Sequence, residues 1–340
     1  MSIAALYREA GEFNSEYDDL MEEVSRYIER LASTTNLTDD VAAVINDAIA
    51  ARGKMLRPKL LMLCASTGPD FKASRDRLCK LAAMVELTHI ASLIHDDIID
   101  DAPERRGRPS IQGRYGKKAA VYAGDFLMSR ISYQVAGDEL NRPGAVLART
   151  VEEMCKGEMG QSRCLYRTDM TVEDYMRNIH GKTAALFMAA CHIGAEEAGC
   201  NYEEVKRFER FGEVFGICFQ LRDDLLDFTS ETGIMGKEVH KDFKDGIYTY
   251  PVLKALSSPE GRKKLEPFLA ANARGEITAR DLKKIQKIVS EEGGIEETRA
   301  QIRKCLSEAQ DILKNYSEYE AVGKILKLLQ KLAIEVNHRG

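Results

Sequence analysis

Residues 78–101 read LCKLAAMVELTHIASLIHDDIIDD, a long apolar run that ends in a cluster of acidic side chains. The apolar part predicts a helix that is buried on most of its faces. Asp96, Asp97, Asp100 and Asp101 then place four carboxylates within six residues. Carboxylates at a helix C-terminus oppose the helix dipole and repel one another, so a cation is needed to neutralise them. Mg²⁺ suits such a cluster, because it takes one or two carboxylates, several waters and substrate phosphates.

The spacing of the acidic residues predicts which of their carboxylates share a helical face. Asp96 and Asp100 are four residues apart, so their carboxylates share one helical face, and we expect Asp97 and Asp101 to stack likewise on an adjacent face. The alternative is a solvated acidic helix end without function. That alternative does not explain why the carboxylates follow so apolar a helix.

A second acidic pattern repeats the first. Residues 219–227 read FQLRDDLLD, and Asp223, Asp224 and Asp227 have the spacing of the first cluster 127 residues further along the chain. This pattern also ends an apolar stretch that predicts a helix. Two facing helices of this kind could hold several Mg²⁺ ions around one polyanion.

Basic residues accompany both acidic clusters. One pair precedes Pro58 near a predicted helix start, where free backbone N–H groups and the helix dipole favour an anion. Any one of these residues alone is compatible with solvated surface, but together they imply two diphosphate sites, one bound through metal and one by basic side chains directly. The residues are Lys54, Arg57, Arg105, Arg106, Lys182 and Lys237.

Proline placement predicts an all-α fold. Residues 144–250 and 268–340 contain no proline, and an interior proline would cost a helix about 3 kcal/mol. Alternating strand patterns are absent, so we expect about a dozen helices. Among them, Thr171 should open a helix to about Ala198 and Asn201 another to about Phe228, and residues 279–292 and 295–315 should form charged amphipathic helices. Residues 102–116, rich in Pro, Gly and Arg, read as a loop. No Ser-, Pro- or Gly-rich linker divides the chain, which predicts a single domain over residues 1–340.

Composition limits the class of function. The chain has 340 residues, of which 44% are hydrophobic, enough for a sizeable core. Its net charge of −5 argues against a nucleic-acid partner. Eight scattered cysteines without a C-x-x-C pair predict no disulfide framework and a reducing compartment. No secretory signal pattern is visible, and the longest uncharged stretch, Thr183 to Ala195, is too short for a transmembrane helix. We therefore expect a cytoplasmic protein.

The motifs together resemble those of the trans-isoprenyl diphosphate synthases, or polyprenyl synthetases. They follow the family's order from about residue 50 to 251, and the C-terminal helices in residues 252–340 fit its layout loosely. The chain departs from the family at residues 245–251, DGIYTYP, where members often have Gly-Lys before Thr-x-Pro. Besides the two aspartate-rich motifs, the matching segments are Gly53-Lys-x-x-Arg-Pro58, Arg105-Arg106-Gly107, Gly157-Glu158-x-x-Gln161, Gly181-Lys-Thr183 and Gly236-Lys237 followed by Asp242.

The resemblance implies an antiparallel helical bundle of the isoprenoid synthase type around a deep apolar central cavity. It implies head-to-tail condensation of isopentenyl diphosphate with an allylic prenyl diphosphate, with release of pyrophosphate and three bound Mg²⁺ ions. The cavity would exclude water, which quenches an allylic cation. No side chain is an obvious general base, so the departing pyrophosphate is the expected proton acceptor. A homodimer is expected.

The resemblance also implies roles for individual residues. The Mg²⁺ ligands would be Asp96, Asp97, Asp100, Asp223, Asp224 and Asp227, with Asp242 acting through a water. The allylic diphosphate would be held by Arg105, Lys182 and Lys237. Isopentenyl diphosphate would be held by Lys54, Arg57, His89 and Arg106. Thr183 and Gln220 would present oxygen dipoles to the reacting carbons. The catalytic set would therefore comprise Asp96, Asp97, Asp100, Asp223, Asp227, Lys182, Thr183 and Gln220.

Small residues precede the first motif and bear on product length. Ala91 and Ser92 lie about 6 to 7.5 Å along the helix from Asp96, and a bulky side chain there would close the pocket early. Since both are small, we expect a product of about six to eight isoprene units. The alternative is a geranylgeranyl or farnesyl diphosphate synthase whose pocket is closed by a neighbouring helix. The candidates for that floor are Phe126, Met128 and Leu147.

Two other classes stay open. A class I terpene cyclase is also all-α with one aspartate-rich motif, but its second motif uses Asn, Ser/Thr and Glu, and it needs no second diphosphate site. A non-catalytic subunit of a heteromeric synthase would have lost aspartates that this chain keeps. Pyrophosphate release with and without isopentenyl diphosphate separates the three.

Overall fold

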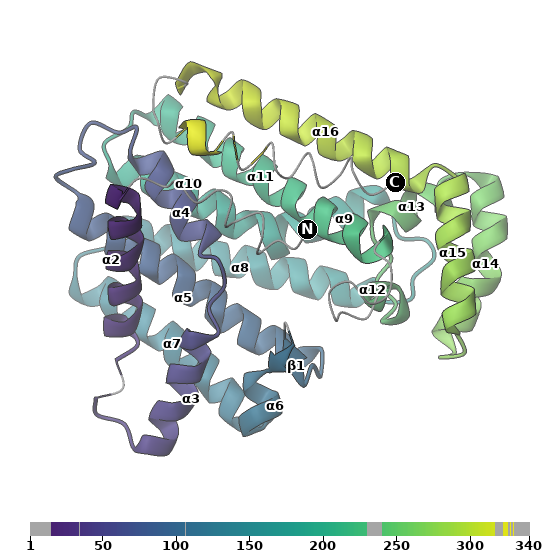
Figure 1. Ribbon diagram of the computed structural model, residues 1–340, viewed down its shortest axis with the longest axis horizontal. Coiled ribbons are helices and arrows are strands. Elements are labelled where there is room, and N and C mark those ends of the chain that lie inside the picture. The colour runs from purple at the N-terminus through teal and green to yellow at the C-terminus, as the bar shows by residue number, and fades with distance from the viewer. Residues whose placement is uncertain are drawn as a thin grey trace. The chain divides into compact units, whose positions relative to one another are not determined.

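The computed structural model describes residues 15–33, 35–105, 107–229 and 240–316, together with 322–325, 327 and 329, and gives no side-chain placement for residues 15–17. The regular structure of its described part is helical apart from one hairpin, whose two strands have two residues each (Figure 1). This confirms the all-α prediction. The elements are α2 (Ser15–Leu31), α3 (Asp39–Ala50), α4 (Leu56–Ala65), α5 (Arg75–Ile99), β1 (Glu104–Arg105), β2 (Arg108–Pro109), α6 (Ile111–Tyr115), α7 (Lys117–Gly137), α8 (Asn141–Arg163), α9 (Val172–Ile179), a π-helical turn (His180–Ala184), α10 (Ala185–Glu197), α11 (Tyr202–Thr229), α12 (Lys241–Lys244), α13 (Tyr250–Leu256), α14 (Pro259–Ala273), α15 (Ala279–Glu291), α16 (Gly294–Leu313) and a 3₁₀ turn (Lys314–Tyr316).

The contacts divide the described residues into two compact units. The first contains those within residues 1–151, 186–209 and 318–322. The second contains those within 152–185, 210–317 and 323–340. The single-domain organisation expected from the sequence stays a prediction.

Helix α5 is the central element of the first unit. It packs against α2, α4 and α7 (Figure 1), and its middle, from Leu81 to Thr88, is buried on every face. Among the described helices, α5 alone is long and apolar enough to cross a membrane, but 72% of its most apolar window is buried inside the protein. Burial of that degree is what a core helix of a folded domain shows.

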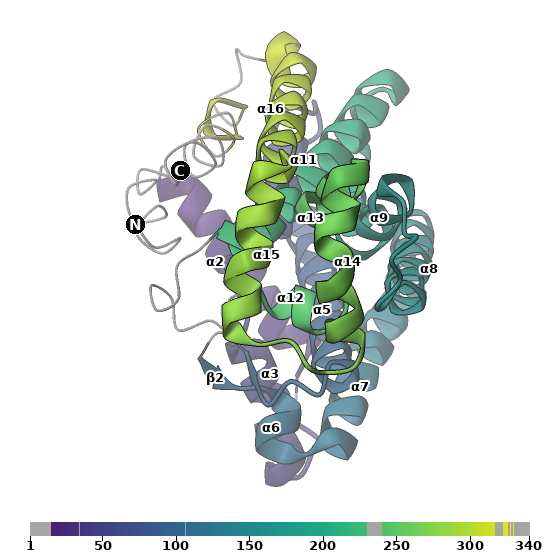
Figure 2. The same ribbon diagram turned by 90° about the vertical axis from the view of Figure 1, so that its right-hand side faces the viewer.

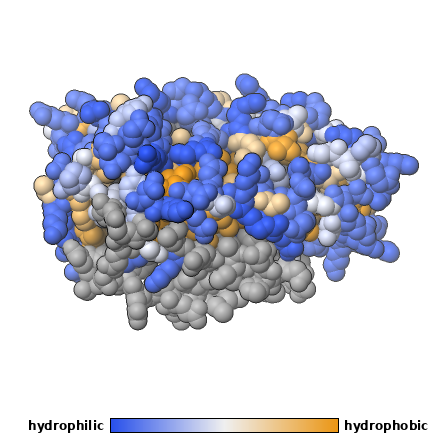
Figure 3. All heavy atoms as spheres, turned by 90° about the horizontal axis from the view of Figure 1, so that it is seen from above, coloured by the Kyte–Doolittle hydropathy of each residue, from blue (hydrophilic) through white to orange (hydrophobic). Residues whose placement is uncertain are grey.

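In the second unit, α13 packs against α14, α15 and α16 (Figure 2). Local capping explains where two helices begin. Thr171 and Asp174 form a reciprocal capping box at α9, and Thr278 and Asp281 form another at α15. Each box satisfies backbone N–H groups that a helix start leaves without partners. Outside the residues drawn in grey, the face seen in Figure 3 is mostly hydrophilic, with apolar residues in small patches.

Two local expectations need correction. Residues 102–116 are not a plain loop: they contain the β1–β2 hairpin and helix α6, which Ser110 caps by accepting a hydrogen bond from the backbone N–H of Gly113 at 3.0 Å. The helix expected from Thr171 to about Ala198 is interrupted by the π-helical turn at His180–Ala184. A π turn is one residue wider than α-helix and occurs often at functional sites.

Candidate active site

The first acidic cluster lies at the end of α5, in the first unit. Asp96 is partly exposed and Asp100 is exposed. The backbone N–H of Asp100 bonds to the carbonyl of Asp96 at 2.8 Å, so the helical path continues between them as expected. Asp101 has a φ of 47° and lies outside the helix. The predicted stacking of Asp97 on Asp101 is therefore wrong, because the chain turns away after Asp100.

Asp97 faces inward instead. It is 5% exposed, and the Nε of Arg105 donates to its Oδ1 at 2.7 Å. The side-chain amide of Gln112 donates to the Asp97 carbonyl at 2.5 Å. The β1–β2 hairpin and α6 thus fold back onto the end of α5 and fix this carboxylate.

The second cluster lies on α11 in the second unit and shows the same division. Asp223 and Asp227 are partly exposed, whereas Asp224 is 3% exposed. The hydroxyl of Tyr175 donates to Asp224 Oδ2 at 2.5 Å, and Nε2 of Gln220 donates to Oδ1 at 2.8 Å. Burial, and next the negative charge of Asp242, raise the pKa of Asp224 to about 8, while these two hydrogen bonds act in the opposite direction.

Each cluster therefore offers a pair of accessible carboxylates one helical turn apart, backed by a buried one. Among the described residues, no three His, Cys, Asp or Glu side chains form a ready-made metal cage. Two carboxylates per cluster nevertheless fit Mg²⁺, which keeps several waters and completes its shell with substrate phosphates. The donor set thus matches a metal that binds together with a phosphorylated substrate.

The π-helical turn brings two further motifs together in the second unit. A Cβ added to Gly157 would lie 2.3 Å from the backbone nitrogen of Lys182, so only glycine allows α8 to approach the turn this closely. Lys182 Nζ lies 2.9 Å from Glu158 Oε1, and the Thr183 hydroxyl donates to Gln220 Oε1 at 2.8 Å. The turn thus holds the buried side chain of Thr183 against the second acidic helix.

The basic pair before Pro58 is placed as the sequence predicts, in the first unit. Helix α4 begins at Leu56, so Lys54 precedes the helix and Arg57 lies in its first turn. The Arg57 guanidinium lies 4.3 Å from the centre of the Phe187 ring, a cation–π contact that orients it. His89 is partly exposed on α5, in the same unit.

The remaining predicted site residues vary in accessibility. Ala91 is fully buried on α5, and Ser92 is partly exposed, with its hydroxyl bonded to the carbonyl of His89 at 2.9 Å. Asp242 lies on α12, close enough to Asp224 to raise its pKa. Arg106 and Lys237 lie outside the described residues.

Tyr175 is a site residue that the sequence did not single out. It lies seven residues before Lys182, two helical turns away, and its side chain is 4% exposed. That spacing was the available signal, because residues two turns apart share a helix face. A buried tyrosine is more often a core residue, and only its contact with Asp224 sets it apart.

A cavity of about 350 Å³ in the second unit lies beside α8 and α9. Six of the residues that line it are charged or polar. The deep apolar cavity expected for a growing prenyl chain stays a prediction. The charged and polar residues of the wall are Glu153, Lys156, Arg163, Arg177, Asn178 and His180.

Comparison with known proteins identifies the family of this chain. The sequence profile of the polyprenyl synthetases matches residues 38–289. Component 2 of the heptaprenyl diphosphate synthase of Geobacillus stearothermophilus is 36% identical over 293 residues, 86% of this chain and 87% of the relative. The octaprenyl diphosphate synthase of Escherichia coli K12 is 33% identical over 267 residues, 74% of this chain and 80% of the relative.

A solved structure of a related protein has the same fold. The polyprenyl synthase of Caulobacter crescentus CB15, complexed with calcium and isoprenyl diphosphate, superposes with a TM-score of 0.83 at 28% identity, covering 100% of this chain and 98% of that one. The fold and motifs thus define an all-α isoprenyl diphosphate synthase. The chain belongs to the polyprenyl synthetase family and is a prenyltransferase.

Proposed function

We propose that this prenyltransferase is Mg²⁺-dependent and condenses isopentenyl diphosphate with an allylic prenyl diphosphate, head to tail, releasing pyrophosphate. The observation that carries the proposal is the paired, accessible carboxylates at Asp96/Asp100 and Asp223/Asp227. The calcium and isoprenyl diphosphate of the Caulobacter structure support a divalent metal and a diphosphate substrate.

The accessible aspartates are the proposed metal ligands, for three ions in the loaded enzyme. Bound Mg²⁺ supplies Lewis-acid neutralisation of the allylic diphosphate, which makes it a better leaving group. Asp97 and Asp224 support the ligand pairs from behind, since their oxygens already accept hydrogen bonds from protein groups. Asp242 contributes through a water.

The basic residues divide between the two substrates. Lys54 and Arg57 lie at the start of α4, where the helix dipole favours an anion, and hold isopentenyl diphosphate. His89 and Arg106 are the further proposed ligands of this substrate. Arg105, Lys182 and Lys237 hold the allylic diphosphate.

The proposed reaction needs polar groups next to the reacting carbon, within a pocket that is otherwise apolar. Oxygens of Thr183 and Gln220 face the electron-poor allylic carbon and lower the energy of the cation. The departing pyrophosphate accepts the proton that the new product loses.

A long product is the favoured outcome. The two relatives compared above make heptaprenyl and octaprenyl diphosphates by name, and Ala91 and Ser92 leave the α5 face before Asp96 without a bulky side chain. We therefore propose a chain of about six to eight isoprene units. The geranylgeranyl alternative requires a floor from another helix.

Assembly and location complete the proposal. We propose a cytoplasmic homodimer, supported by the exposed apolar side chains of Val121, Tyr122 and Tyr133 on α7, which are 39%, 63% and 71% exposed. A second candidate is the catalytic component of a two-component synthase, because the Geobacillus relative is named as component 2.

One experiment tests the proposed substrates, the reaction and the product length together. The purified chain is incubated with farnesyl diphosphate and Mg²⁺, with and without isopentenyl diphosphate, and pyrophosphate and product length are measured. We expect release only with both substrates, and products longer than twenty carbons. Release without isopentenyl diphosphate would indicate a cyclase. A folded but inactive chain would indicate that a second component is required.

A further inference from the structure

A chain of hydrogen bonds in the second unit connects Tyr175 to Thr183. The Tyr175 hydroxyl donates to Asp224 at 2.5 Å, Gln220 Nε2 donates to Asp224 at 2.8 Å, and the Thr183 hydroxyl donates to Gln220 Oε1 at 2.8 Å. Its members come from α9, the π-helical turn and α11. Tyr175, Asp224 and Thr183 are 4%, 3% and 7% exposed, so water does not replace these bonds readily.

The direction of each bond fixes the next group. The Gln220 amide directs its NH₂ side to Asp224 Oδ1 and its carbonyl side to Thr183. The single proton of the Thr183 hydroxyl is then committed to Gln220. Only lone pairs of the Thr183 oxygen are left for any other neighbour. An oxygen that presents lone pairs without its proton stabilises a nearby cation.

We propose that Tyr175 is a positioning residue for prenyl transfer, acting through Asp224 and Gln220 to orient the hydroxyl of Thr183. The inference rests on the proposed function, in which Thr183 faces the reacting carbon. Tyr175 itself touches no substrate. Its ring packs edge-on against Tyr250, with ring centres 5.8 Å apart, so a ring without the hydroxyl can still fill its place.

Tyr175→Phe is the primary test. We expect kcat to fall about 10- to 100-fold, since small misplacements near reacting groups cost up to that factor, while KM for both diphosphates changes by less than about threefold because binding contacts are intact. Tyr250→Phe is the matched control: it removes the other hydroxyl of the same ring pair, which bonds to nothing in the described part of the chain. It should retain wild-type kcat.

A double-mutant cycle separates positioning from general packing. In a Thr183→Val background, Tyr175→Phe should have no further effect on kcat, because the group it orients is gone. Additive losses would overturn the proposal, as would a wild-type kcat for Tyr175→Phe in an active enzyme. Inactivity of the wild type with both substrates and Mg²⁺ would instead refute the proposed function, and the inference with it.

Asp224→Asn keeps the test decisive if Tyr175→Phe does not fold. An asparagine there can accept from Gln220 through Oδ1 and donate to the Tyr175 oxygen through Nδ2, so the orientation of Thr183 survives. We expect kcat within about tenfold of wild type and unchanged Mg²⁺ dependence, whereas Asp224→Leu, which breaks the chain, should lose kcat about 100-fold. A weakened Mg²⁺ dependence in Asp224→Asn would show a metal ligand and overturn the positioning role.

Discussion

At the scale of single residues, identical side chains in one motif have different surroundings. In both Asp-Asp-x-x-Asp patterns the first and last aspartates are accessible, while the middle one is buried and hydrogen-bonded. The helical period explains this division, because residues four apart share a face and the residue between them is rotated by about 100° toward the core. Burial thus separates the accessible carboxylates, which we propose as metal ligands, from Asp97 and Asp224, which accept hydrogen bonds from protein groups.

The accessible aspartates should be needed for turnover and not for folding. We expect Asp96→Asn and Asp223→Asn each to lower kcat by about 100-fold or more, because metal neutralisation is worth several kcal/mol. Thermal melting should stay near wild type. Asp101→Asn is the control, since Asp101 is exposed outside the helix and, among the described residues, pairs with Lys117. Normal turnover of either site variant at saturating Mg²⁺ would contradict the two-cluster arrangement.

Arg57→Ala should distinguish the two diphosphate sites. We expect KM for isopentenyl diphosphate to rise about 10- to 100-fold, as a charge-assisted contact is worth about 1.5–3 kcal/mol, with a smaller change for the allylic substrate. Lys237→Ala should show the reverse preference. Steady-state kinetics with each substrate varied in turn measure both, and equal effects on both substrates in both variants would reject the assignment.

At the scale of elements, α5 couples core packing to product length. Ala91 is fully buried and Ser92 is partly exposed, so only the second position has room for a larger side chain without overpacking. We expect Ser92→Phe to stay folded and to shorten the product to twenty carbons or fewer. Ser132→Phe on α7 is the control, because Ser132 is exposed and makes the same kind of helical hydroxyl bond, to Met128. Unchanged product length in Ser92→Phe would show that this face does not line the growing chain.

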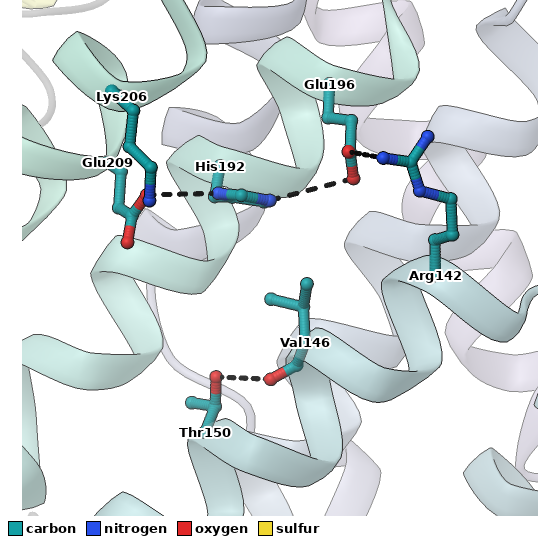
Figure 4. A network of polar contacts seen from close by, with 7 residues as sticks. All are labelled: Arg142, Val146, Thr150, His192, Glu196, Lys206 and Glu209. Atoms are coloured by element: carbon teal, nitrogen blue, oxygen red, sulfur yellow. Dashed lines mark hydrogen bonds and ion pairs between the residues drawn. The ribbon is translucent and has the colours of Figure 1, made fainter. Parts of the chain in front are cut away.

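Residues of the first unit are also joined by a charged network around His192 (Figure 4). His192 lies between two carboxylates, with Nδ1 3.3 Å from Glu209 and Nε2 3.6 Å from Glu196. Arg142 on α8 and Lys206 on α11 complete the network. The hydrogen bond with His192, followed by Lys206, lowers the pKa of Glu209 to about 2, although burial opposes the shift.

This lowered pKa predicts a loss of stability in acid. A carboxyl with a depressed folded pKa contributes stability that is full above its unfolded value of about 4.5 and is lost as the pH falls toward 2. We expect Glu209→Gln to lower the free energy of unfolding by about 2–3 kcal/mol at pH 7, and the gap to wild type to close between about pH 5 and pH 2. Denaturant melts across that range measure the gap. Glu203→Gln, exposed on the same helix, should show no such closing, and a pH-independent gap for Glu209→Gln would contradict the assignment.

At the scale of the whole molecule, the exposed apolar side chains of α7 allow the proposed homodimer to be tested. Tyr133→Glu on α7 should convert the proposed homodimer to a monomer, because a carboxylate would have to be desolvated in an apolar contact. Light scattering after size-exclusion chromatography measures the mass. Tyr202→Glu, at an equally exposed tyrosine on α11, should leave the dimer intact. A wild-type monomer that gains activity only with a second protein would support the two-component candidate instead.

The sequence alone determined the helical class and the family of enzymes to which the chain belongs. Absence of proline, apolar periodicity and caps such as Thr171 and Asn201 are local properties of the chain, so helices α9, α11, α15 and α16 begin close to where they were expected. The motif residues are also local, because ligand type and spacing along one helix decide what they can bind.

Only the tertiary structure decided which of those residues are buried and which side chains they contact. Asp97 is fixed by Arg105 beyond the helix end, Asp224 by Tyr175 from another helix, and Thr183 by Gln220, and each partner lies elsewhere in the sequence. The π-helical turn likewise lies close to Gly157, which is distant from it in the sequence. Hydrogen bonds and burial depend on distances in space, which spacing along one segment does not specify.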